Sequence, residues 1–460
     1  MLYKEFTFID FLFATIWLLM FTVLALYIRQ KNVNNPLYRF FLAAYAYKIA
    51  MGFLYAVIYV YVYNGGDTLA YWKGGDVLNN LFYDSPVNYL TEIWRDTSKI
   101  KYIPSCYSLK TGYPPTWIYF EKNSWFVCKL SSFFSFFSFG SYVAINLIFS
   151  FLSFYISFKF YLFVDKITKI KSELILIAVV FVPSVSFWCG GISKDTIVFC
   201  FSLLSIMYLW KLIYEKFTFR NTLIALFSIY CLIQSRPFIL IAIFLPLFVL
   251  LVFRLNRNSP FITRLITRVI GITTTVVIIA VFFRFSELLG EFSTSKLVST
   301  AETTYNDFQV NQVYTGKRYD LGISDFSTQS LVRAGPLAIL TSIYRPFIWE
   351  AESVLMLLNG LESVFLIFMT FQLLRKKKSK HMLNIEKSDT NRDFIIFCIA
   401  FVIILAFFVG LTSGLFGVLS RQKAPILPFF MLFLFNRIHK KSLTDQNTIP
   451  NSNQKLVKTS

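Results

Sequence analysis

An acid and a tyrosine that could do chemistry stand directly after the second long apolar segment of the chain. Asp67 and Tyr71 are four residues apart, so a helix there would carry both on one side. The adjacent Gly65 and Gly66 would let the backbone approach a ligand closely. A carboxylate at this place is a candidate general base or cation ligand. The alternative is that Asp67 only caps a helix that begins at Thr68.

A second candidate site lies in the central stretch 183–195, where an apolar run ends in aromatic residues and glycines. Ser193 is expected to cap a helix that begins at Lys194, and Asp195 in the first turn complements the positive helix end. That role explains Asp195 but not Lys194, because a cation at a helix N-terminus is unfavourable unless an anion lies nearby. Lys194 is therefore a candidate phosphate ligand.

Other charged residues stand at breaks between apolar segments. Arg236 precedes a proline between two short segments, where the alternative is that its side chain reaches toward lipid headgroups. The remaining cations of this class are Arg345, Arg421 and Lys423, and the acid Glu350 follows the first of them. Glu362 is the acid deep within its own apolar segment. We expect it to pair with a buried cation such as Lys48, in preference to a catalytic role.

The composition indicates what kind of elements must position these residues. Of 460 residues, 56% are hydrophobic and 15% are charged, and the mean hydropathy is +0.58. One soluble core cannot bury so large an apolar fraction, so the chain is predicted to be an all-α polytopic membrane protein. The net charge of +20 falls in short basic clusters between apolar runs. This pattern favours anionic membrane lipid as a partner, and no zinc-finger spacing or basic helix indicates nucleic acid.

Apolar stretches of about 15 to 25 residues predict about eleven membrane spans in a single domain, residues 1–441. The predicted spans are 7–28, 40–63, 141–163, 173–189, 196–211, 221–235, 237–253, 269–286, 353–374, 394–413 and 424–436. Two long outer-face connections are predicted at about 64–140 and 287–352. The first is expected to hold an interfacial helix near 124–137. The second is expected to end in a piece, 335–349, that lies along or re-enters the membrane.

The basic clusters predict the orientation of the chain. Six clusters of Lys and Arg fall on alternate connections, which assigns them to the cytoplasm by the positive-inside rule. The N-terminus is then outside, and the C-terminus is inside with a disordered polar tail, 442–460. The five candidate cations, Lys194, Arg236, Arg345, Arg421 and Lys423, fall at the outer boundary against this bias. Together they predict an anion site for the phosphate or pyrophosphate of a lipid carrier.

Several absences narrow the chemistry further. His381 and His439 are the only histidines and are cytoplasmic in this topology, so no histidine metal site is expected at the outer face. No Walker-type phosphate loop and no dinucleotide fingerprint occurs, so no nucleotide-driven step is expected. Among six scattered cysteines, Cys106 and Cys128 share one loop in which a disulfide is possible. A donor already carried on a lipid fits these absences better.

The motifs resemble those of bacterial membrane proteins encoded with surface-polysaccharide genes. These are the GT-C-type, lipid-phosphosugar-dependent glycosyltransferases and the O-antigen or capsule polymerases. The parts that look alike are Gly66-Asp67 with Tyr71, Pro183-Ser184 with Phe187-Trp188 and Lys194-Asp195, Arg236-Pro237, Arg345-Pro346-Phe347 with Glu350, and Arg421-Gln422-Lys423 with Pro428-Phe429. The resemblance extends from about residue 60 to residue 436 as an ordering of short motifs.

The resemblance implies that Asp67 deprotonates the acceptor hydroxyl and that the outer cations stabilise the leaving diphosphate of a polyprenyl-linked donor. The implied substrate-binding residues are Tyr71, Lys194, Asp195, Arg236, Arg345, Glu350, Arg421 and Lys423. The implied partners are a polyprenyl-phosphate-linked sugar donor, a glycan acceptor and membrane lipid. The second acidic motif of many such transferases has no clear equivalent here. No metal ligand or cofactor is therefore assigned, and a divalent cation stays an open alternative.

The predicted function is thus a glycosyltransferase or polysaccharide polymerase at the outer face of a bacterial inner membrane. One alternative is a transporter or flippase for a lipid-linked oligosaccharide or another anion. A transporter is expected to carry charged residues near mid-bilayer in several spans, whereas only Lys48 and Glu362 lie deep here. A non-catalytic membrane scaffold is the other alternative, and it would not need cations on the outer side.

Overall fold

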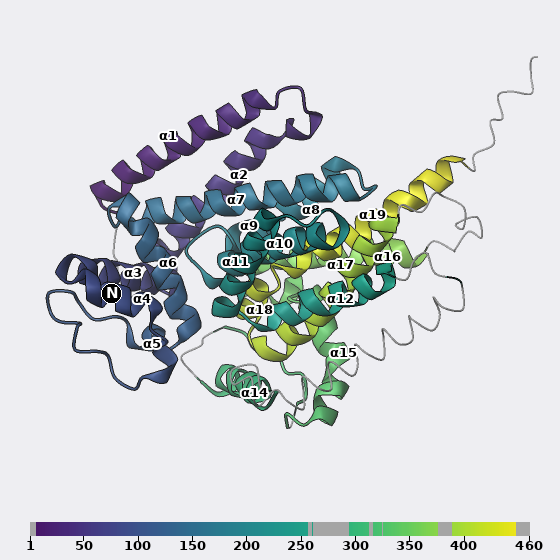
Figure 1. Ribbon diagram of the computed structural model, residues 1–460. Helices are drawn as coiled ribbons and strands as arrows, with labels where there is room; N and C mark the ends of the chain where they lie inside the picture. Colours follow the sequence, from purple (N-terminus) through teal and green to yellow (C-terminus); the bar gives the residue numbers. More distant parts are fainter. Residues whose placement is uncertain are drawn as a thin grey trace, which may run out of the picture.

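The structure is a computed structural model that describes residues 6–255, 260, 294–311, 316–323, 325–375 and 389–447. Within these residues the chain is helical and forms no strand; one isolated bridge pairs Arg318 with Leu415. The predicted all-α class is therefore confirmed for the described chain. Figure 1 shows long helices packed side by side, with shorter ones at one end of the bundle.

Seven described helices are long and apolar enough to cross a membrane, or up to eight spans if a bent pair counts as one. The seven are α1 (Phe8–Lys31), α2 (Phe41–Tyr61), α7 (Tyr142–Ile167), α10 (Lys194–Tyr214), α12 (Phe238–Leu255), α16 (Val354–Arg375) and α17 (Asp389–Ser413). The bent pair is α18 (Phe416–Gln422) and α19 (Ile426–Asn447), which meet at 64°. The chain is thus a polytopic membrane protein.

The predicted count of eleven spans is not confirmed, and the differences have local causes. The segment 173–189 is divided into α8 (Ser172–Val180) and α9 (Pro183–Trp188). The division falls where Pro183 lacks an N–H and disfavours helix in the residue before it. The segment 221–235 is α11 (Phe219–Ser235), which has 17 residues and is not among the seven helices long and apolar enough to cross a membrane. The segment 269–286 lies outside the described residues.

Hydrogen bonds align three helices at one end of the bundle. The amide of Phe6, before α1, donates to the hydroxyl of Tyr61 at the end of α2, at 3.4 Å. The hydroxyl of Ser141, which caps α7, donates to Oδ1 of Asp10 in α1, at 3.1 Å. The start of α1, the end of α2 and the start of α7 therefore share one membrane face. Helix α7 is largely buried inside the bundle, whereas α1 is mostly exposed at its edge (Figure 1).

The connection 64–140 folds into a group of helices at that same end (Figure 1). They are α3 (Asp67–Asp84), α4 (Pro86–Trp94), η2 (Thr97–Lys99), α5 (Thr116–Tyr119) and α6 (Lys122–Ser138). The helix predicted at 124–137 is present and is part of α6. A Cβ on Gly74 would lie 2.5 Å from Sγ of Cys128, and one on Gly75 would lie 2.8 Å from the amide of Ser132. These glycines therefore allow α6 to pack closely against α3. Cys106 and Cys128 are both free thiols, so the disulfide considered possible is absent.

The second long connection is described from residue 294 onward. It holds α14 (Thr294–Val310), α15 (Thr328–Tyr344) and η4 (Ile348–Glu350). The apolar piece expected over 335–349 is mostly the second half of α15. That half packs on α17, since the hydroxyl of Ser342 donates to the carbonyl of Ala406 at 2.7 Å. At the far end of the chain α19 extends to Asn447, and residues 448–460 of the predicted tail lie outside the described residues.

Candidate functional site

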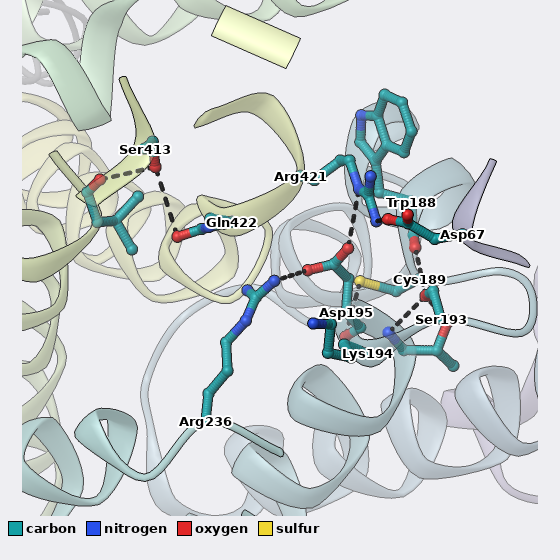
Figure 2. Close-up of polar contacts among 12 residues, drawn as sticks. Asp67, Trp188, Cys189, Ser193, Lys194, Asp195, Arg236, Ser413, Arg421 and Gln422 are labelled. Carbon is teal, nitrogen blue, oxygen red and sulfur yellow. Dashed lines mark hydrogen bonds and ion pairs between the residues drawn. The ribbon is translucent and has the colours of Figure 1, made fainter. Parts of the chain in front are cut away.

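Arg421 of α18 joins two carboxylates that come from distant parts of the chain. Its Nε lies 3.1 Å from Oδ2 of Asp195, the second residue of α10. Its Nη2 lies 3.0 Å from Oδ2 of Asp67, the first residue of α3. The Asp195 side chain is 1% exposed, whereas that of Asp67 is 34% exposed. Figure 2 shows Arg421 between the two acids, so the outer acid can meet a ligand while the inner one stays enclosed.

Arg236, between α11 and α12, is the second cation on Asp195. Its Nη2 lies 2.7 Å from Oδ1 of that carboxylate (Figure 2). A guanidinium carries five N–H donors, and this one meets the carboxylate through Nη2, so N–H groups remain that a bound anion can use. The four residues Asp67, Asp195, Arg236 and Arg421, here called the charge cluster, carry two negative and two positive charges.

Local sequence explains why both acids sit where they do. Ser193 caps α10 and accepts a hydrogen bond from the amide of Thr196 at 3.0 Å, so the predicted cap is confirmed. Asp67 is the first residue of α3 and not its N-cap, which corrects the alternative of a helix starting at Thr68. The cap is Gly66, with a φ of 95° that favours glycine. Both carboxylates thus lie in the first turn of a helix, where the helix dipole favours negative charge.

An aromatic group lines the inner side of the charge cluster. The guanidinium of Arg421 lies 5.7 Å from the ring of Trp188 at the end of α9. Trp188 packs with Phe187, Tyr55 and Tyr59 in a small buried group. The two tyrosines were not predicted as site residues, although their spacing of four residues on α2 was a usable signal. This wall excludes water from one side of Arg421 and so strengthens its ion pairs.

Lys194 is balanced by a protein carboxylate that the sequence did not single out. Its Nζ lies 2.8 Å from Oε1 of Glu121 and 3.0 Å from Oγ of Ser124, at the start of α6. Burial raises the pKa of Glu121, but the Lys194 charge and hydrogen bonds from Lys194 and Ser124 together bring that pKa below its usual value. The anion expected near Lys194 is therefore supplied by Glu121. Tyr71, in α3, is only 1% exposed and packs in the protein core.

Arg345 and Glu350 form a separate ion pair close to α18. Nε of Arg345 lies 3.0 Å from Oε1 of Glu350, and its guanidinium lies 4.8 Å from the ring of Phe416. Lys423 is fully buried, and its amine donates to the backbone carbonyl of Arg345 at 3.0 Å. Arg421 in α18 therefore faces the charge cluster. Lys423, the C-cap of the same helix, instead binds the backbone carbonyl of Arg345.

Glu362 does not pair with Lys48; the buried cation that acts on it electrostatically is Lys423. In α16 its carboxylate accepts a hydrogen bond from the amide of Ser184 at 2.7 Å and another from the hydroxyl of the same residue. Ser184 is near the start of α9, where backbone N–H groups lack intrahelical partners. Glu362 therefore accepts a hydrogen bond from a backbone N–H in the first turn of α9 that has no partner within the helix. The partner was missed because the break between α8 and α9 exposes an amide that apolar patterning does not reveal.

An apolar pocket of about 290 Å³ lies beside the start of α9. Its lining includes Phe181, Pro183, Leu361, Phe365, Leu427 and Met431, with Glu362 as the acid among them. These residues come from the α8–α9 break, α16 and α19. Because α16 is mostly exposed, the pocket lies next to a lipid-facing helix. Helix α9 begins at Pro183, beside this pocket, and ends about 8 Å further along its axis at Trp188. The ring of Trp188 contacts Arg421.

Within the described residues, no group of three or more His, Cys, Asp and Glu side chains is placed to hold a metal ion. No protein-family model, characterised protein or solved structure matches the chain. The function therefore has to be inferred from the charge cluster, the aromatic wall and the apolar pocket.

Proposed function

We propose that the protein is a membrane glycosyltransferase or polysaccharide polymerase that takes a sugar from a polyprenyl-phosphate-linked donor at the outer face of a bacterial inner membrane. The observation that carries this proposal is the charge cluster. Arg421 meets the partly exposed Asp67, the buried Asp195 joins Arg421 to Arg236, and an apolar pocket lies about 8 Å away along α9.

The arginines suit the phosphate groups of such a donor. Guanidinium groups bind phosphate through two parallel hydrogen bonds, and these are the stronger kind because both partners are charged. Arg236 keeps unused N–H groups, and the side chains of Arg236 and Arg421 are 14% and 20% exposed. A phosphate can therefore replace Asp67 on Arg421. The buried Asp195 stays in place and keeps both arginines in position through its two ion pairs.

The acid then becomes available for chemistry. Once a phosphate occupies Arg421, Asp67 is free to accept the proton of the acceptor hydroxyl. The oxygen attacks the anomeric carbon, the bond from that carbon to the donor phosphate breaks, and the bond electrons leave with the lipid-linked phosphate. Arg236 and Arg421 stabilise the charge on this leaving group. The proton ends on Asp67, so the step balances without a cofactor.

The apolar pocket supports a lipid-linked donor over a free nucleotide sugar. Burial of a hydrocarbon chain in an apolar cleft is favourable. The lining of this pocket is almost entirely aliphatic and aromatic. A donor with its phosphates on Arg421 would lead its chain along α9 toward this pocket. Membrane lipid next to α16 gives the chain an entry route.

The test is surface glycan length in cells that carry single substitutions. Asp67→Asn removes the base, and Arg236→Ala removes a cation of the charge cluster; both are expected to abolish or shorten the glycan. Asp76→Asn is the matched control, since Asp76 lies on the same helix and pairs with the surface residue Lys73 at 2.9 Å. Normal glycan in both test variants, at normal protein levels, would rule the mechanism out.

A flippase for the same lipid-linked anion is the alternative proposal. It predicts that purified protein in liposomes moves the donor between leaflets without forming a glycosidic bond. Loss of bond formation in Asp67→Asn with retained donor binding favours the transferase. Donor translocation that persists in Asp67→Asn favours the flippase.

A further inference from the structure

Four cations from three helices gather at the end of α10 that is opposite to the charge cluster. Lys159 and Lys166 belong to α7, Lys211 lies in the last turn of α10, and Arg220 is the second residue of α11. Helix α10 packs against both α7 and α11, and the charges of the other three cations act on Lys211. These four residues, here called the basic group, therefore lie near one another. Asp195 is about 24 Å away along the axis of α10.

The basic group has more positive charge than the acids beside it can balance. Nζ of Lys166 lies 2.7 Å from Oε1 of Glu215, the C-cap of α10. Asp165, also on α7, accepts a hydrogen bond from the hydroxyl of Ser172 at 2.5 Å. Even with both acids counted, the four cations keep an excess of two positive charges. Like charges held close together repel, so an anion bound among them would be favourable.

An apolar surface begins at the same place. Phe219, Leu223 and Leu226 are exposed and follow one another at helical spacing along one side of α11. Arg220, next to Phe219, is exposed as well. In a protein that spans a membrane, an exposed apolar stripe of this kind suits hydrocarbon chains, and cations at its end suit the polar headgroups. The start of α11 therefore joins a cationic surface to an apolar one.

We propose that the basic group and the apolar stripe of α11 bind one anionic phospholipid, with its phosphate at Lys211 and Arg220 and its acyl chains along Leu223 and Leu226. Hydrogen bonds between charged N–H groups and phosphate oxygens are of the stronger kind. A free phosphate would meet the cations but leave the stripe uncovered, which favours the lipid. The predicted orientation assigns this end to the cytoplasmic leaflet, where anionic lipids attract basic residues. The site does not depend on the proposed transferase function.

The test measures the unfolding temperature of the purified full chain in neutral detergent with added phosphatidylglycerol. Wild-type protein is expected to unfold at a temperature higher by about 2 °C or more, because a ligand that binds only the folded state stabilises it. Phosphatidylcholine has the same chains without net negative charge, and inorganic phosphate has the charge without chains, so each should have a much smaller effect. No shift with phosphatidylglycerol, or an equal shift with either of the other two, overturns the proposal.

Two variants locate the effect. Arg220→Gln removes an exposed cation, and its half-maximal shift should need several-fold more phosphatidylglycerol. The double variant Lys211→Met with Arg220→Gln should respond no more to phosphatidylglycerol than to phosphatidylcholine. Lys110→Met is the matched control, because Lys110 is an exposed lysine that pairs with Asp84 in the connection 64–140, and it should respond like wild type. An undiminished response in the double variant excludes the basic group as the site. Should that variant fail to fold, Arg220→Gln decides, and an unchanged half-maximal concentration overturns the proposal.

Discussion

Arg421 and Asp67 are 354 positions apart in the chain, yet Nη2 of the arginine lies 3.0 Å from Oδ2 of the acid. In this arrangement the candidate base is occupied by a cation that a phosphate donor would also bind. Donor binding and release of Asp67 are therefore one event in the proposed mechanism. The arrangement would keep the base from acting before the donor is in place.

Arg421→Lys is predicted to lose activity although it keeps the positive charge. The guanidinium reaches Asp195 through Nε and Asp67 through Nη2 at the same time, and a lysine ammonium is a single point charge on a flexible stem. We expect a loss of at least about 10-fold in kcat/KM, or about 1.4 kcal/mol of transition-state stabilisation. The measurement is glycan transfer with lipid-linked donor. Near-normal transfer by the lysine variant would contradict a two-carboxylate role for Arg421.

Asp195→Asn is predicted to destabilise the fold. The acid is 1% exposed and balances two arginines, so its loss leaves two like charges close together. Removing one partner of a buried ion pair costs about 3 kcal/mol, at the lower end of the usual range because both arginines keep some exposure. The free energy of unfolding in detergent measures it.

The double variant Asp195→Asn with Arg236→Gln should recover part of this loss, since Arg421 keeps its ion pair with Asp67 and Arg236 is the cation left without one. Asp84→Asn is the control; Asp84 pairs with the exposed Lys110 at the surface, and such pairs contribute about 1 kcal/mol or less. If the double variant is no more stable than Asp195→Asn, charge repulsion between the arginines is not the cause.

Leu427→Trp is predicted to change the response to donor chain length. The larger side chain would fill part of the apolar pocket between α9, α16 and α19. We expect KM for a long-chain polyprenyl donor to rise several-fold while KM for a short-chain analogue changes little, because the short chain does not reach the pocket. Leu357→Trp, at an exposed position of α16, is the control. Equal effects on both donors would place the chain elsewhere.

Stability of the helices in the connection 64–140 is predicted to rise with pH between about 8 and 10.4. Burial lowers the pKa of Lys129 in α6 to about 8, while an unfolded lysine titrates near ~10.4. In this interval the unfolded chain binds more protons than the folded one, so the free energy of unfolding increases with pH. Below pH 8 the full cost of charging the buried amine is present.

The Lys129→Met variant should lose that part of the pH dependence. The check is the difference in unfolding free energy between wild type and variant, measured at several values from pH 7 to pH 10.5. Lys110→Met removes an exposed lysine and serves as the control for loss of a lysine charge. A difference that does not change across this interval would show that Lys129 is charged to the same extent in both states.

Apolar patterning predicted most of the long helices because hydropathy is a property of each local stretch. It identified α1, α2, α7, α10, α12, α16 and α17 within a few residues. It failed where backbone chemistry interrupts an apolar run, as at Pro183, which begins a new helix. The same break leaves the Ser184 amide without an intrahelical partner, and this amide binds Glu362. The incorrect span at 173–189 and the incorrect pairing of Glu362 with Lys48 therefore have one cause.

By itself, the sequence determined an all-α membrane protein, the cap at Ser193 and a set of charged residues next to the ends of apolar segments. Only the tertiary structure decided which charges meet: Arg421 with Asp67 and Asp195, Lys194 with Glu121, and Lys48 with no described acid. Membrane insertion depends on the summed hydropathy of one stretch. An ion pair depends on which helices become neighbours and at what height, and many distant packing contacts set that together.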